Sequence, residues 1–223
     1  MIEIKSLSKR FGDVTAIDDL SLSFEGKVLG VCGAKNSGKT VLLNIICGIV
    51  PPSEGEALVF GENLSLDNAA ANKAVGYLLE DSPMPDEMTP NEFLKFVGQA
   101  KGIPAAKLEK QIEAALDITA LYDLKDIYIR HLSIGQRKIL GVAQALLGNP
   151  KLIVLDDPFT ALNKREKAIM RSIISTLGEI KTVVVSARKA STVEDLCTEV
   201  ITLSAPLVKD EVTDDETVEK EDE

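Results

Sequence analysis

The sequence predicts an α/β fold: a mostly parallel sheet with helices on both faces, an N-terminal antiparallel β part, and a helical insert at about residues 81–147. Three observations lead to this prediction. The first segments of the 223-residue chain alternate polar and apolar residues, as half-exposed strands do. The last third alternates short aliphatic runs with helical segments. The residues between these two parts have helical rather than strand-like patterns.

The N-terminal part is expected to form an antiparallel pair of strands. Strand-like alternation occurs in Ile2–Leu7 and in Leu20–Phe24, and the turn-prone sequence Phe11–Asp13 lies between them. Lys27–Cys32 then has the pattern of a third strand, followed by a glycine-containing loop and a helix at about residues 40–49. The order strand, loop, helix is the start of a parallel α/β unit.

The middle and the end of the chain continue this organisation. Short strands are predicted at Ala57–Phe60 and Val75–Leu79, and two helices between Asn91 and Leu121, separated by Gly102-Ile103-Pro104. After Ser133 the pattern is helix, strand, helix, strand, helix, strand. The three strands of this last part are Leu152–Leu155, Thr182–Ser186 and Glu199–Leu203.

Charge is distributed unevenly along the chain. Residues 209–223 contain nine acidic residues and two lysines, which contribute −7 to the formal charge of −10 and leave −3 for residues 1–208. This composition predicts a domain over residues 1–208 and a disordered acidic tail over 209–223. The sign of the charge, and the lack of a basic patch elsewhere, argue against nucleic acid or anionic lipid as a partner of the tail.

The composition also points to a cytosolic protein. No segment has the roughly 18 uninterrupted apolar residues of a membrane span, since Val41–Val50 is broken by Asn44. The N-terminus lacks the apolar core of a signal peptide. Three cysteines lack metal-ligand spacing and have apolar neighbours, so buried, unreactive thiols are expected at Cys32, Cys47 and Cys197.

A phosphate-binding motif follows the third strand. Gly33–Thr40 fits G-x-x-x-x-G-K-[ST], in which backbone N–H groups and the helix N-terminus wrap a β-phosphate. Lys39 would reach the β and γ oxygens and the Thr40 hydroxyl would help to hold Mg²⁺, together with Asp156 at the end of a later strand. The motif therefore predicts a P-loop NTPase core with a nucleoside triphosphate and Mg²⁺ as ligands. The candidate binding residues of this segment are Gly33, Asn36, Ser37, Gly38, Lys39, Thr40 and Val41.

A second motif, LSIGQRK at Leu132–Lys138, follows the insert and precedes a helix. With the phosphate loop and the LIVLD strand in this order, the chain resembles the ATP-binding subunits of ABC transporters over Phe11–Leu203. Val75–Phe96 resembles in particular the branch that pairs with separate ABC-2-type membrane subunits in exporters, where glutamate at the position of Glu80 often replaces glutamine. The resemblance implies the ABC ATPase fold.

The resemblance also implies partners. A second ABC ATP-binding subunit would face the first head to tail, and each ATP would be clamped between the phosphate loop of one and the signature of the other. The pair would dock beneath a separate transmembrane permease subunit, at the inner face of the cell membrane. Glu80 would reach the metal and the transmission loop, and Phe11 would stack on adenine, unless Phe11 is a core residue. Ser133, Gly135 and Gln136 would address the partner's γ-phosphate.

Three departures from the family pattern lie in the phosphate loop, in the signature and after the TAL sequence. Asn36 replaces the usual middle glycine of the loop, which asparagine can tolerate because it visits the left-handed region more readily than most residues. Ile134 places a β-branched side chain where backbone must approach a partner's ATP, so closure is expected to be weakened. Asn163 replaces the aspartate that usually follows TAL.

Two further departures affect hydrolysis. Asp157 takes the position of the catalytic glutamate and is one methylene shorter, and general-base catalysis is worth about 10²–10⁴ in rate. Arg188 stands in place of the switch histidine, either as a permanent cation that grips a γ-phosphate or as a solvent-facing substitute. With Asp157, Arg188 and Glu80 as candidate catalytic residues, we expect slow, absent or partner-dependent hydrolysis.

Other functional classes are distinguished by single features of the sequence. A soluble ABC-type ATP sensor without a membrane partner stays open as an alternative. The LSIGQ sequence argues against a phosphate-loop kinase of small metabolites. The absence of a long heptad segment between the phosphate loop and the signature argues against DNA-repair relatives. His131, the only histidine, is expected to be a structural polar residue rather than a base.

Overall fold

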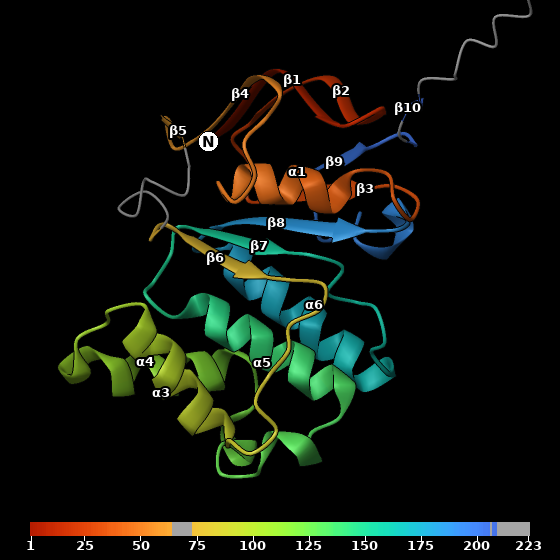
Figure 1. The fold of residues 1–223 in the computed structure, drawn as a ribbon. Helices are drawn as coiled ribbons and strands as arrows, with labels where there is room; N and C mark the ends of the chain where they lie inside the picture. The colour runs from red at the N-terminus through yellow and green to blue at the C-terminus, as the bar shows by residue number, and fades with distance from the viewer. Residues whose placement is uncertain (64–72, 206, 209–223) are drawn as a thin grey trace, which may run out of the picture.

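The computed structural model describes residues 1–63, 73–205 and 207–208. Figure 1 shows successive layers: an antiparallel sheet, helix α1, a parallel sheet, and helices α5 and α6, with helices α3 and α4 beside α5. The acidic tail predicted at 209–223 lies outside the described residues. Within the described ranges, every helix is too short or too polar to span a membrane.

The antiparallel sheet has five strands in the order β10-β2-β1-β4-β5. Their bounds are β1 Ile2–Phe11, β2 Val14–Phe24, β4 Glu54–Val59, β5 Glu62–Asn63 and β10 Leu207–Val208. The predicted pairing of the first two strands is confirmed, and Phe11 pairs with Val14 next to the turn. Gly12 in this turn has φ 57, a conformation that glycine adopts without steric cost.

The parallel sheet also has five strands, in the order β6-β7-β8-β3-β9. Their bounds are β3 Val28–Cys32, β6 Val75–Leu78, β7 Leu152–Leu155, β8 Thr182–Ala187 and β9 Glu199–Thr202. Alternate side chains enter two different cores: in β7, Leu152 and Val154 pack with α1, whereas Ile153 and Leu155 pack with the core that includes α5 and α6. Burial on both faces explains the continuous aliphatic runs of these strands.

Five α-helices complete the described fold, and their bounds are α1 Lys39–Ile46, α3 Pro90–Ala100, α4 Ala105–Ile118, α5 Ile134–Leu146 and α6 Lys164–Gly178. The predicted separation of α3 and α4 at Gly102-Ile103-Pro104 is confirmed. Capping boxes begin three of the helices, with N-cap residues Thr89, Ser133 and Asn163. Asn163 thus performs the capping that an aspartate at this position would also provide.

The prediction of a helix between β8 and β9 is wrong. Residues Ala190–Thr192 form a single 3₁₀ turn instead. The adjacent β-branched residues Thr192 and Val193 disfavour a longer helix, and Val193 is fully buried in the core that includes α5 and α6. Burial of Val193 ties the segment between β8 and β9 to this core.

The insert helices are attached to the sheet through a close approach of α5 to β6. A Cβ atom on Gly76 of β6 would lie 2.0 Å from the carbonyl oxygen of Ala145 in α5. Gln144 of the same helix donates from Nε2 to the Tyr77 carbonyl oxygen at 2.8 Å. Glycine at position 76 therefore allows the helix backbone to touch the strand.

We expect Gly76→Ala to lower the free energy of unfolding by about 1–3 kcal/mol, because the added methyl group must push two backbones apart. Urea denaturation monitored by circular dichroism measures the change. Ile180→Ala serves as the control: Ile180 is 67% exposed, and its truncation should change the free energy by no more than about 0.5 kcal/mol. Identical midpoints for Gly76→Ala and the wild type would contradict the close approach.

Candidate functional site

The phosphate loop joins the end of β3 to α1 and includes two residues in the left-handed region. Asn36 has φ 65 and Gly38 has φ 86. A Cβ atom on Gly38 would lie 2.4 Å from the Ala16 carbonyl oxygen, so only glycine fits there. Asn36 adopts the left-handed conformation that was predicted for it, which keeps the path of the loop without the usual glycine.

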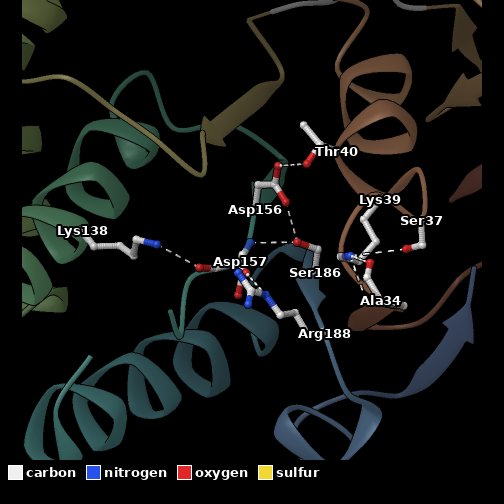
Figure 2. A network of polar contacts seen from close by, with 10 residues as sticks. Ala34, Ser37, Lys39, Thr40, Lys138, Asp156, Asp157, Ser186 and Arg188 are labelled. Atoms are coloured by element: carbon white, nitrogen blue, oxygen red, sulfur yellow. Dashed lines mark hydrogen bonds and ion pairs between the residues drawn. The ribbon is translucent and has the colours of Figure 1, made fainter. Parts of the chain in front are cut away.

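Lys39 is folded over the loop, as Figure 2 shows. Its Nζ donates to the carbonyl oxygens of Gly33 at 2.8 Å and Ala34 at 2.6 Å, and lies 3.4 Å from Ser37 Oγ. The residue is only 8% exposed, so these acceptors take the place of water around its ammonium group. Phosphate oxygens form stronger, charge-assisted hydrogen bonds than carbonyls do, so this ammonium is suited to an anion in the loop.

Asp156 at the end of β7 connects three elements of the site. The residue is 1% exposed, and its carboxylate accepts hydrogen bonds from Thr40 of α1 at 2.7 Å and from Ser186 of β8 at 2.6 Å. Mg²⁺ in phosphate sites takes one or two protein oxygens and completes its shell with water and phosphate. The Thr40–Asp156 pair fits that requirement. No cluster of three His, Cys, Asp or Glu suited to a metal occurs among the described residues.

Asp157 is held at its backbone and at its carboxylate. Its N–H donates to Ser186 Oγ at 2.8 Å, and its carbonyl oxygen accepts from Lys138 Nζ at 3.0 Å. Arg188 Nε lies 3.5 Å from Asp157 Oδ2. Arg188 thus forms an ion pair with the neighbouring aspartate (Figure 2), while its side chain stays 54% exposed. Its two alternative roles, as a cation that grips a γ-phosphate or as a solvent-facing substitute, both stay predictions.

One cavity of about 360 Å³ brings most of these groups together. Glu80, which follows the end of β6, lines this cavity together with Asp156, Asp157 and Arg188. Val14 and Ala16 of β2 also line it, although nothing in their sequence context marked them. The lining residues that the sequence did predict are Asn36, Ser37, Gly38, Lys39, Thr40, Val41, Glu80, Asp156, Asp157 and Arg188.

Phe11 lies outside the set of described residues that line this cavity. Its side chain is 50% exposed at the end of β1, so the alternative that it is a core residue is wrong. Lys9 Nζ lies 4.9 Å from the centroid of its ring, a cation–π arrangement. An exposed ring at this position leaves stacking on a nucleotide base as a prediction.

The signature residues are engaged with one another rather than with the phosphate loop. Ser133 Oγ accepts from the Gln136 N–H at 3.0 Å and donates to Glu166 Oε1 at 2.5 Å, and Gln136 Oε1 accepts from the Ser133 N–H at 2.9 Å. A Cβ atom on Gly135 would lie 2.1 Å from Glu166 Oε2. Ile134 is 69% exposed. Among the described residues, none of these four signature positions lines the cavity.

The cysteines and the histidine play no part in this site. Cys32 and Cys47 are buried, and burial raises the pKa of both thiols. Burial also raises the pKa of the half-buried Cys197 to about 12. Such thiols stay protonated at neutral pH, as expected of unreactive residues. His131 is exposed and accepts a hydrogen bond from Arg130 Nε at 3.2 Å.

Sequence comparisons agree with this geometry. A family model described as ABC transporter matches residues 17–160. The ABC transporter ATP-binding protein YdbJ of Bacillus subtilis is 31% identical over 99% of this chain and 72% of its own length. Nod factor export ATP-binding protein I of Ralstonia nicotianae is 30% identical over 89% of this chain. The chain spans 63% of that protein, and 23% of ABC transporter A family member 1 of Dictyostelium discoideum, to which it is 30% identical.

Solved structures share the fold. The dimeric structure of MJ0796, a bacterial ABC transporter cassette, superposes with a TM-score of 0.80 at 23% identity over 92% of this chain and 94% of that chain. A post-hydrolysis state of the same cassette, bound to ADP and Pi, also gives 0.80, at 21% identity over 93% and 98%. The family model covers more than half of the chain, and the similarity to YdbJ extends over nearly all of it. The chain therefore belongs to the ABC transporter family, as one of its ATP-binding domains.

Proposed function

We propose that the chain is a transporter subunit that binds Mg·ATP at the interface with a second ABC ATP-binding subunit. One observation carries this proposal: the phosphate loop, Asp156 and Asp157 share a cavity, whereas Ser133 and Gly135 of the same chain lie outside it. A nucleotide that contacts both a phosphate loop and a signature therefore needs two chains, arranged head to tail.

In this proposal the loop amides and Lys39 bind the phosphates of ATP. Thr40 and Asp156 hold the metal, with Glu80 at the edge of the same cavity. Mg²⁺, when bound, supplies positive charge that neutralises phosphate oxygens. The signature residues Ser133, Gly135 and Gln136 contact the nucleotide of the second subunit, and Phe11 stacks on adenine.

Hydrolysis is proposed to be slow, or to depend on the partner subunit. Asp157 is the candidate general base, but its carboxylate is paired with Arg188 and its side chain is only 10% exposed. A base must come within hydrogen-bond reach of the water from which it takes a proton. The short side chain and the arginine both work against that approach.

We also propose that the two ATP-binding subunits close on ATP and that this closure moves a separate transmembrane permease. Leu79 and Phe96, on either side of the segment that begins at Glu80, are 44% and 56% exposed and offer apolar contact to such a partner. Relatives named Nod factor export ATP-binding proteins support export as the direction of transport. The chain would then lie on the inner face of the cell membrane.

Lys39→Ala should weaken ATP binding by about 10–100-fold, the loss expected when a charge-assisted hydrogen bond worth about 1.5–3 kcal/mol is removed. Isothermal titration with Mg·ATP measures the affinity. Lys167→Ala is the control, because Lys167 is an exposed residue of α6. Equal affinity of Lys39→Ala and the wild type would contradict the assignment of the loop.

The double substitution Asp157→Glu with Arg188→His should raise ATP turnover by about tenfold or more, since it lengthens the base and removes its cationic partner. Phosphate release at high protein concentration, which favours dimers, measures the rate. Asp157→Asn should not exceed the residual rate of Lys39→Ala. A wild-type rate that Asp157→Asn leaves unchanged would rule out Asp157 as the base.

Affinity purification from detergent extracts should recover a membrane protein together with the wild-type chain. The docking surface is tested with Phe96→Asp, which places a charge at the apolar contact and should reduce the recovered amount at unchanged ATP affinity. Recovery of the chain without any membrane protein would instead favour the soluble ATP sensor.

A further inference from the structure

Asp157 has a backbone conformation that its sequence neighbours disfavour. Its φ is 43, in the left-handed region that non-glycine residues rarely occupy. The next residue is Pro158, and a residue before proline is normally confined to extended backbone with negative φ. A conformation of this kind persists only where the surrounding structure holds it.

Two side-chain hydrogen bonds hold the backbone of Asp157 in place, and its carbonyl oxygen also accepts from the Thr160 N–H at 3.4 Å. Ser186 Oγ accepts from its N–H at 2.8 Å, and Ser186 is itself fully buried in β8 and bonded to Asp156. On the other side, Lys138 Nζ donates to the Asp157 carbonyl oxygen at 3.0 Å. The two contacts lie on opposite sides of the residue, so together they fix the orientation of both of its peptide planes.

Lys138 reaches this carbonyl from α5, the helix whose first residues are the signature. Ser133 is the N-cap of α5, and Lys138 follows in its second turn. The side chain of Lys138 is partly buried, whereas Asp157 is only 7% exposed. Water is therefore a poor substitute for the ammonium group at this carbonyl.

We propose that Lys138 is a positioning residue that holds Asp157 in its left-handed conformation and so directs the carboxylate into the nucleotide cavity. The consequence for ATP rests on the proposed function. In a head-to-tail dimer, the start of α5 meets one nucleotide and Asp157 of the same chain faces the other. Lys138 then provides a direct link between the two sites through one rigid helix.

The test compares Lys138→Met, which removes the donors at similar length, with Lys138→Arg, which keeps them. Hydrogen exchange of the Asp157 amide, followed by NMR in the full chain, reports whether the residue is still held. We expect exchange about tenfold faster or more in Lys138→Met, and near-normal exchange in Lys138→Arg. Lys110→Met, at an exposed position of α4, is the control and should change nothing.

Hydrogen exchange of the Leu29 amide, in β3 of the parallel sheet, distinguishes a positioning effect from general destabilisation. A local effect leaves the Leu29 amide as protected as in the wild type. Unchanged exchange at Asp157 in Lys138→Met would overturn the proposal, and so would equal acceleration at Asp157 and Leu29.

Nucleotide measurements on the same variants separate this proposal from the proposed function. Lys138→Met should bind Mg·ATP with wild-type affinity, because Lys138 does not touch the phosphate loop in the described structure. In the Asp157→Glu with Arg188→His background it should lower kcat about tenfold at constant KM, with recovery in Lys138→Arg. Failure of the wild type to bind ATP would refute the proposed function and leave the exchange result standing. Unchanged kcat despite faster exchange would refute the link to hydrolysis.

Discussion

The buried carboxylate of Asp156 is the interaction on which the arrangement of the site depends. The carboxylate of a residue that is 1% exposed must be satisfied by hydrogen bonds, and here the donors are hydroxyl groups of Thr40 and Ser186. These residues belong to α1 and to β8, on either side of the end of β7. Because the Asp156 carboxylate needs both hydroxyl donors, it holds the phosphate loop and the ends of two parallel strands at the same point (Figure 2).

The same network determines the surroundings of the proposed base. Ser186 accepts from the Asp157 N–H while it donates to Asp156, so a single hydroxyl orders both aspartates. Arg188 then pairs with the second carboxylate. An arginine cannot accept a hydrogen bond or lose its charge near neutral pH, so the site keeps a fixed positive charge beside Asp157. This fixed charge is the basis for the proposal that hydrolysis is slow or depends on the partner subunit.

The signature is held by hydrogen bonds within the chain. Glu166 accepts from Ser133 and also caps its own helix by accepting from the Asn163 N–H at 2.9 Å. This buried carboxylate ties the first turn of α5 to the first turn of α6, and it leaves no room for a side chain at position 135. Ile134 projects into solvent from the same turn. A second subunit would thus meet a preformed surface.

The sequence by itself determined the features that depend on neighbouring residues. The alternation of aliphatic runs and helical segments predicted the parallel sheet, and Gly33–Thr40 predicted the loop, including the left-handed conformation of Asn36. Local pattern was misleading before β9, where burial of Val193 ended the expected helix after one turn. There a tertiary contact outweighed the helical appearance of the segment.

Only the tertiary structure decided which side chains face Asp157. Lys138 and Ser186 lie 19 and 29 positions away from it along the chain, and Arg188 is two residues beyond Ser186. Such distant residues become neighbours because parallel strands place their carboxyl ends at one edge of the sheet and α5 packs beneath it. A pattern in a single sequence reports periodicity and local motifs, whereas these contacts depend on how the sheet and helices are assembled.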